Sequence, residues 1–190
     1  MEEKEVLGMF EKSGALLTGH FLLSSGLHSG HYLQAALVLQ WPSQALALAR
    51  ELAKRFCKDK VTAVVGPALG GVTLAFAVAQ IFDNCRALFA ERENGVFTLR
   101  RGFSLKKDDR VLVVEDVITT GSSLREVIRL AHSFGATVVG VGALVERSTE
   151  PVDFDLKKEV LLKVSLKTFP PNACPLCHQK VPLVKPGSRR

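Results

Sequence analysis

The sequence predicts an α/β fold in which a mostly parallel central sheet is flanked by helices. Two observations lead to this prediction. Short apolar runs alternate with helical patterns through the middle of the chain, as they do in strand–helix–strand units. The apolar runs are also continuous, which is typical of strands that are buried on both faces. With 190 residues, 47% of them hydrophobic, the chain is long enough for one domain with a substantial core.

The N-terminal third contains two expected helices and a hairpin-like segment between them. Residues 2–17 look helical and begin with acidic side chains, whereas residues 21–40 are punctuated by Gly and Ser. Pro42 stands where a second helix would begin, and the apolar residues up to 56 repeat with a helical period.

The middle of the chain carries the alternating elements. We expect strands at 61–65, 86–90, 110–115, 137–146 and 159–166, and helices at 71–82 and 122–134. The segment 91–109 is polar and interrupted by Gly, and the tail from Pro170 is expected to be irregular.

Residues 61–82 contain no charged side chain and are almost long enough to span a bilayer. The middle of this stretch, however, reads GPALGG, which favours a strand, a turn and a helix over a membrane span. The acidic start of the chain also differs from a secretory signal. We therefore expect a cytoplasmic protein without a membrane partner.

The net charge of +6 suggests attraction to anions, which could be nucleic acid, phosphorylated metabolites or neither. The basic residues are dispersed along the chain, apart from short pairs such as Arg189-Arg190. We expect no nucleic-acid partner.

The stretch VLVVEDVITTGSS (111–123) ends an apolar strand with two carboxylates and a hydroxyl-rich turn. A strand, a Gly-containing turn and a helix start form a cup of backbone N–H groups that suits a phosphate. Glu115 and Asp116 lie one step earlier, where carboxylates suit the hydroxyls of a sugar. Together these groups predict a site for a ribose 5-phosphate. The loop GPALGG (66–71) offers small residues that let a backbone approach a second anion.

VLVVEDVITTGSS resembles the signature of type I phosphoribosyltransferases, which bind phosphoribosyl pyrophosphate (PRPP). The resemblance implies the type I phosphoribosyltransferase fold, with residues 1–190 as a single domain, a small N-terminal hood at about 1–40 and a C-terminal tail at 168–190. It also implies which residues bind PRPP: Ala68, Leu69, Gly70, Arg92, Glu115, Asp116, Val117, Ile118, Thr119, Thr120, Gly121, Ser122 and Ser123.

The segment FLLSSGLHSGHYLQ (21–34) resembles the hood of orotate phosphoribosyltransferases, and VERS (145–148) and the CPLC tail resemble the bacterial branch of that family. The family transfers ribose 5-phosphate from PRPP to orotate in pyrimidine biosynthesis, which gives orotidine 5'-monophosphate and pyrophosphate. The resemblance implies a homodimer and Mg²⁺ bound mainly through PRPP. It also implies that Arg147 binds the orotate carboxylate, and that the orotate site is made by Ser25, Gly26, Tyr32, Leu33, Thr119 and Arg147.

The sequence departs from the family in the mobile loop that closes over PRPP. Glu91-Arg92 stands where Arg-Lys is expected, and Ser24 replaces a hood lysine. The candidates for neutralising pyrophosphate are Arg92, Arg100, Arg101, Lys106 and Lys107. Glu115, Asp116 and Arg92 are assigned as the catalytic residues. Two alternatives stay open: transfer to another base, and a PRPP-sensing regulator that binds nucleic acid and has lost catalysis.

Four cysteines are too few for a disulfide scaffold. Cys57 and Cys85 have apolar neighbours and are predicted to be core thiols. The CPLCH stretch allows half of a zinc site, with Cys174, Cys177 and His178, a redox pair, or a plain tail hairpin. The other histidines show no metal-binding spacing, so no metal ligand is assigned.

Overall fold

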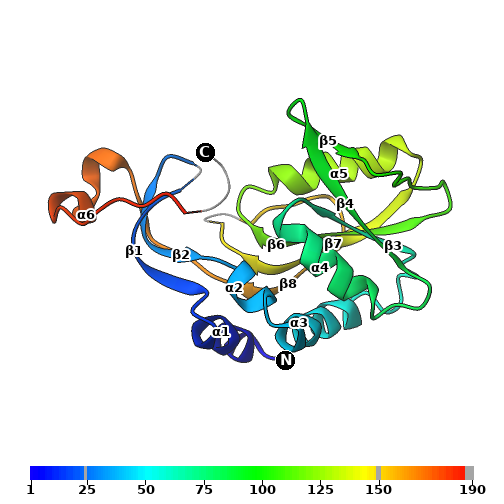
Figure 1. Cartoon of the computed structure of the whole chain (residues 1–190), viewed down its shortest axis with the longest axis horizontal. Coiled ribbons are helices and arrows are strands. Elements are labelled where there is room, and N and C mark those ends of the chain that lie inside the picture. Colours follow the sequence, from blue (N-terminus) through cyan, green and yellow to red (C-terminus); the bar gives the residue numbers. More distant parts are fainter. Residues whose placement is uncertain (24, 149–150, 187–190) are drawn as a thin grey trace.

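The chain forms two β-sheets of unequal size in the computed structural model, which describes residues 1–23, 25–148 and 151–186 (Figure 1). The larger sheet has six strands in the order β5-β4-β3-β6-β7-β8, and the smaller has three in the order β1-β2-β9. Ser24 and Arg189-Arg190, which the sequence analysis singled out, lie outside the described residues.

The six-stranded sheet confirms the predicted α/β fold. Its strands are β3 (Ala63–Pro67), β4 (Arg86–Glu93), β5 (Val96–Leu99), β6 (Arg110–Ile118), β7 (Thr137–Glu146) and β8 (Lys158–Lys163). All neighbouring pairs are parallel except β4 and β5. The apolar run Val111, Leu112, Val113 and Val114 is fully buried, as expected for a strand covered on both faces.

Helices cover both faces of this sheet. On one face, α3 (Pro42–Lys54) and α4 (Gly70–Ala79) pack with Val64, Leu112 and Leu144. The other face is covered by α5 (Ser122–Ser133), which packs with Val65 and Val113. Because successive residues of a strand point to opposite faces, each apolar run contributes to both cores.

The smaller sheet belongs to a hood that stands apart from the central sheet (Figure 1). Its strands are β1 (Leu16–Leu22), β2 (His28–Leu33) and β9 (Thr168–Phe169). The short helices α2 (Ala36–Leu39), η1 (Pro171–Ala173) and α6 (Pro175–His178) flank it in the chain. We use "hood" for β1, β2 and β9, and "tail" for the residues after 169.

The N-terminal helix is shorter than predicted. Helix α1 spans Glu3–Lys12, and residues 16 and 17 already belong to β1. Gly14 has a positive φ of 68°, a conformation that ends a helix. The acidic first turn is present, with Glu3 and Glu5 near the helix N-terminus.

The segment 91–109 is more ordered than predicted, because β4 continues to Glu93 and turns back as β5. Asn94 and Gly95, which form the two-residue turn, both have positive φ values. Asn-Gly is a strong hairpin signal, and it was present in the sequence.

Two further predictions about the chain have clear outcomes. The uncharged stretch 61–82 contains β3 and α4, as expected, and no described helix is long and apolar enough to cross a membrane. The prediction that Cys57 is a core thiol was wrong, since Cys57 is exposed. Cys85 is half-buried, and its burial raises the pKa of the thiol to about 11.

Candidate active site

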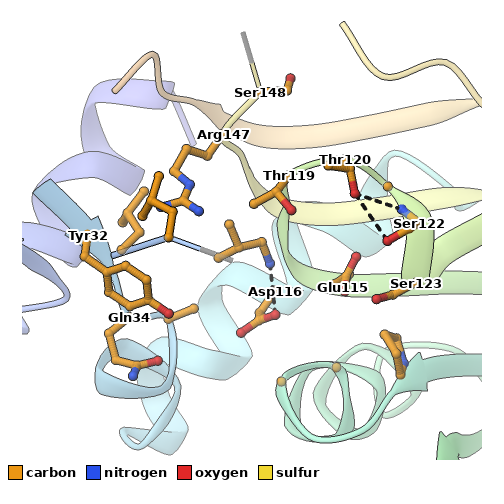
Figure 2. Close-up of a pocket in the computed structure, with 18 of the residues that line it drawn as sticks. Tyr32, Gln34, Glu115, Asp116, Thr119, Thr120, Ser122, Ser123, Arg147 and Ser148 are labelled. Carbon is orange, nitrogen blue, oxygen red and sulfur yellow. Dashed lines mark hydrogen bonds between the residues drawn. The ribbon is translucent and has the colours of Figure 1, made fainter. Parts of the chain in front are cut away.

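A pocket of about 1370 Å³ opens at the carboxyl ends of β3, β6 and β7. These three strands are neighbours in the parallel sheet, so the loops that follow them meet at one edge. Residues of β1 and β2 close the pocket on the hood side. The volume exceeds that of a typical single-ligand pocket, so it has room for two substrates. Figure 2 shows the side chains that line it.

The turn after β6 and the start of α5 line this pocket. Thr119, Thr120 and Ser122 line it, and Ser122 begins α5. The N-cap residue Gly121 has no side chain to cap α5, and the Ser122 N–H donates a long hydrogen bond of 3.4 Å to Thr120 Oγ1. The hydroxyl of Thr120 lies 3.2 Å from that of Ser122. A helix N-terminus of this kind is suited to an anion.

Gly121 is required in this turn for two reasons. Its φ of 73° is a left-handed conformation that favours glycine. A Cβ atom at this position would also lie 2.6 Å from Val152 Cγ1 and 2.8 Å from Phe154 Cζ. The turn is therefore packed closely against the segment that follows β7.

Glu115 and Asp116 line the floor of the pocket beside this turn (Figure 2). Asp116 Oδ1 accepts a hydrogen bond of 3.0 Å from the N–H of Val117. Burial raises the pKa of Asp116, although this backbone hydrogen bond acts in the opposite direction. The carboxylate thus lies in a poorly solvated position, where it interacts strongly with a sugar or a cation.

The loop after β3 brings a second backbone segment to the pocket. Gly66 and Gly71 are in close contact, because a Cβ atom on Gly66 would lie 2.3 Å from Gly71 O. A Cβ atom on Gly70 would lie 2.5 Å from Asp116 Oδ1, so this glycine makes room for the carboxylate. The Ala68–Leu69 peptide is cis. Helix α4 starts at Gly70 without a side-chain cap, which gives the pocket a second uncapped helix N-terminus.

Arg147 follows β7 and reaches into the pocket from the side opposite the α4 loop (Figure 2). Its backbone N–H donates to Ile118 O at 2.8 Å, which ties it to the turn after β6. Among the described residues, no group accepts a hydrogen bond from its buried Nη1 atom. Burial lowers the pKa of Arg147, and the nearby Tyr32 partly opposes this effect. A buried cation with an unused donor favours an anionic ligand at this position.

Glu146, the residue before Arg147, anchors the end of β7. Glu146 is 4% exposed and accepts hydrogen bonds from Lys158 Nζ at 2.9 Å and from the Val152 N–H at 3.1 Å. Burial alone would raise the pKa of Glu146, but these bonds hold it below its ordinary value. Glu146 is therefore anchored as a carboxylate and stays turned away from Arg147, which is left free for a ligand.

The hood contributes the wall that faces Arg147. Tyr32, Leu33 and Ser25 line the pocket, and the Tyr32 ring centre lies 5.7 Å from Arg147 Cζ. Burial raises the pKa of Tyr32, while Arg147 lowers it and Asp116 raises it further. A flat aromatic ring beside a guanidinium offers a suitable surface for a planar, charged base.

The structure brings most of the predicted site residues together, but not all of them. Those that line the pocket are Ser25, Tyr32, Leu33, Ala68, Leu69, Gly70, Glu115, Asp116, Val117, Thr119, Thr120, Gly121, Ser122, Ser123 and Arg147. Gly26, Ile118 and Arg92 do not line it. Ile118 is fully buried beneath the turn.

Arg92 lies on the β4–β5 hairpin, where it forms an ion pair of 2.8 Å with Glu126 and stacks on Phe97. Arg101 pairs with Glu91 at 2.8 Å, and Arg100 lies 3.6 Å from Glu93. None of these arginines, nor Lys106 or Lys107, lines the pocket of its own chain. The role assigned to Arg92 stays a prediction.

Several pocket residues escaped the sequence analysis. They include Gln34, Arg125, Asp153, Thr168 and Pro186. Arg125 lies in the first turn of α5, directly after the signature, so its position along the helix was a usable signal. Thr168 and Pro186 reach the pocket only because the tail returns to the hood, and no local pattern predicts that return.

Comparison with known proteins shows the family of the chain. The family model of the phosphoribosyl transferase domain matches residues 37–170. The orotate phosphoribosyltransferase of Pelotomaculum thermopropionicum is 52% identical over 190 residues, which cover all of both chains. The orotate phosphoribosyltransferase of Thermotoga maritima is 52% identical over 186 residues, covering 98% of this chain and 97% of that protein.

A solved structure agrees with these sequence relatives. The crystal structure of orotate phosphoribosyltransferase from Aeropyrum pernix superimposes with a TM-score of 0.71 at 27% identity, over 84% of this chain and 93% of that one. The fold, the pocket and full-length identity near one half lead to one conclusion: the chain belongs to the phosphoribosyltransferase family, within its orotate phosphoribosyltransferase branch.

Proposed function

We propose that the chain transfers ribose 5-phosphate from PRPP to orotate, which gives orotidine 5'-monophosphate and pyrophosphate, a step of pyrimidine biosynthesis. One observation carries the choice of base. The buried Nη1 atom of Arg147 has no acceptor among the described residues, and orotate brings a carboxylate that can fill this role. Adenine, hypoxanthine and uracil have no carboxylate to offer.

The pocket can be divided among the parts of the two substrates. The uncapped N-terminus of α5, with Thr119 and Ser122, would receive the 5'-phosphate. The uncapped N-terminus of α4 would receive the pyrophosphate. Glu115 and Asp116 lie at the floor of the pocket and would bind the ribose hydroxyls. Orotate would then lie against Tyr32 and Leu33, with its carboxylate on Arg147.

This arrangement supports displacement at the anomeric carbon. The bond from ribose C1 to pyrophosphate breaks and the bond to orotate N1 forms, with positive charge developing on the sugar, as in glycosyl transfer generally. The carboxylates of Glu115 and Asp116 would stabilise that charge. The two helix N-termini would hold both ends of PRPP in line with the base.

Mg²⁺ is proposed as a cofactor that binds mainly through PRPP. The carboxylates that line the pocket are Glu115, Asp116 and Asp153, and hard oxygen donors of this kind fit the ion. One oxygen from each of these three carboxylates would fill only half of the octahedral shell of a Mg²⁺ ion. Phosphate oxygens and water would supply the other ligands. The ion would neutralise the charge of pyrophosphate.

A homodimer is proposed because the pocket is poor in cations. Arg125 and Arg147 are the arginines that line it, and no lysine of the described residues does so. Pyrophosphate carries several negative charges, and the basic side chains of the β4–β5 hairpin and the residues that follow do not face the pocket of their own chain. We propose that these residues act in the site of a second copy. The cytoplasmic location stays a prediction.

The test is a base-selectivity assay. Orotate, uracil, hypoxanthine and adenine are each incubated with the purified chain, PRPP and Mg²⁺, and loss of base is followed by absorbance and by product chromatography. We expect orotate to be consumed far faster than the other three bases, and the double variant Glu115→Ala/Asp116→Ala to be inactive. Turnover of another base in place of orotate would overturn the proposal, as would PRPP binding without any turnover.

A further inference from the structure

Four potential metal ligands meet in the hood and tail. His20 belongs to β1, His28 begins β2, Cys174 precedes α6 and Cys177 lies within it. Their ligand atoms all lie within 4.8 Å of one another. None of the four lines the active-site pocket. We call these side chains the hood–tail cluster.

The distances within the cluster are close to those of a tetrahedral zinc site. Zn–S and Zn–N bonds of tetrahedral geometry place nitrogen and sulfur ligands about 3.6 Å apart. Cys174 Sγ lies 3.5 Å from His20 Nε2, and Cys177 Sγ lies 3.7 Å from His20 Nε2 and 3.3 Å from His28 Nδ1. The nitrogens of His20 and His28 are 2.9 Å apart, so an ion would separate the two rings by only about half an ångström.

A hydrogen bond outside the cluster fixes the orientation of His20. Its Nδ1 atom lies 2.8 Å from Val181 O. Because a carbonyl oxygen only accepts, Nδ1 carries the hydrogen, and Nε2 presents a lone pair to the cluster. Metal-bound histidines commonly donate their second N–H to a carbonyl or carboxylate in this way.

Three of the four side chains are buried, and Cys177 is exposed. His20 is 2% exposed, His28 is 5% exposed and Cys174 is fully buried. The neighbouring Phe21 and Leu23 are buried but belong to neither of the two core clusters in the described part of the chain. This end of the hood therefore has little apolar packing of its own, a situation in which a structural metal commonly replaces a core.

We propose that His20, His28, Cys174 and Cys177 bind a structural zinc ion. On binding, the two thiols lose their protons to solvent and the thiolates and neutral imidazoles complete four-coordination. Four protein ligands leave no open position, so the ion would support the fold without taking part in the reaction. His178, considered from the sequence, is exposed and lies outside the cluster.

The ion would also hold one wall of the active site. The tail runs beside β1: Leu22 N donates to Val184 O at 2.8 Å, and Val184 N donates to His20 O at 2.8 Å. Two residues further on, Pro186 lines the active-site pocket, as do Leu22 and Leu23. Loss of the ion should therefore raise the KM for orotate more than it lowers kcat.

The first experiment measures metal in the full-length chain, expressed without a histidine tag. Elemental analysis should find about one zinc per chain. Co²⁺ added to the chelator-stripped protein should give the thiolate charge-transfer and tetrahedral d–d absorption bands. Both readouts use the unmodified chain, so they do not depend on the folding of a variant.

Matched variants assign the ligands. Cys174→Ser/Cys177→Ser and His28→Ala should lose the zinc and the Co²⁺ bands, and the KM for orotate should rise severalfold. The controls Cys57→Ser/Cys85→Ser and His31→Ala should keep the zinc and the Co²⁺ bands, because these residues lie outside the cluster. A zinc-free chain that gives no Co²⁺ bands would overturn the proposal. So would a Cys174–Cys177 disulfide in the freshly purified protein, or full zinc content in the double serine variant.

Discussion

Arg147 and Asp116 lie in the same pocket, and burial shifts their pKa values in the direction that disfavours each charge. Burial lowers the pKa of Arg147 and raises that of Asp116. Neither residue forms an ion pair among those found in the described chain. Buried charged groups without an ion pair destabilise the folded protein, and they are available to bind a ligand.

Replacing Asp116 by Asn should therefore stabilise the protein while it abolishes function. A carboxyl with a raised pKa in the folded state costs stability once the pH exceeds its ordinary value of about 4. We expect the Asp116→Asn variant to have a higher Tm than the wild type at pH 7, and the difference to vanish near pH 3. The kcat/KM for PRPP should fall by about 100-fold or more.

Thermal unfolding across this pH range, with PRPP kinetics at pH 7, checks both parts. Asp108→Asn is the matched control, since Asp108 is exposed and lies outside the pocket. A lower Tm for Asp116→Asn at pH 7 would contradict the buried, destabilising carboxylate.

At the scale of elements, the site is built from two strand–turn–helix units side by side. Strands β3 and β6 are neighbours, and each leads through a glycine-containing turn into a helix without a side-chain cap. The turn after β6 depends on Gly121, whose φ is positive and whose Cβ position is blocked by Val152 and Phe154. The geometry of the proposed phosphate site thus depends on packing against the segment after β7.

Gly121→Ala should displace this turn and raise the KM for PRPP at least tenfold. Gly102→Ala is a matched control, because Gly102 has a φ of 75° but nothing within 4 Å of a Cβ atom. The control should lose only about 1 kcal/mol of stability, because an alanine in the left-handed conformation is strained. Denaturant unfolding and PRPP kinetics of both variants distinguish the effect of backbone strain from the effect of the clash with Val152 and Phe154. Equal effects on PRPP binding would argue against the packed turn.

The sequence predicted the elements of the central sheet well, because burial on both faces leaves a continuous apolar pattern. The run from Val111 to Val114 is an example. The Asn94-Gly95 hairpin was missed although its turn signal was present, because Glu91, Arg92 and Glu93 interrupt the apolar pattern before the turn. The hood–tail cluster could not be predicted, since His20 and Cys174 are brought together by tertiary structure over 154 positions.

At the scale of the whole molecule, the active-site pocket is lined both by residues that follow strands of the central sheet and by residues of the hood. The residues proposed to bind PRPP follow strands of the sheet, whereas the wall proposed for the base comes from β1, β2 and the returning tail. Arg92 of the β4–β5 hairpin pairs with Glu126 and does not line the pocket of its own chain. A second copy is therefore the proposed source of the missing cations.

Mixing two inactive variants tests this sharing of residues. In a dimer of Asp116→Asn with Arg92→Ala, one of the two sites would combine an intact Asp116 with an intact Arg92 from the other chain. Equimolar refolded mixtures should recover about a quarter of wild-type activity, given random pairing in a twofold dimer. No recovery in a mixture shown to exchange subunits would mean that Arg92 acts within its own chain, or not at all.

The most direct test of the account is the ratio of kcat/KM for orotate to that for uracil, measured in the wild type and in Arg147→Gln. If the Arg147 guanidinium binds the orotate carboxylate, the ratio should fall by about 100-fold. Arg125→Gln, which changes another pocket arginine, should affect both bases equally and leave the ratio unchanged. An unchanged ratio in Arg147→Gln would contradict the assignment of orotate to this site.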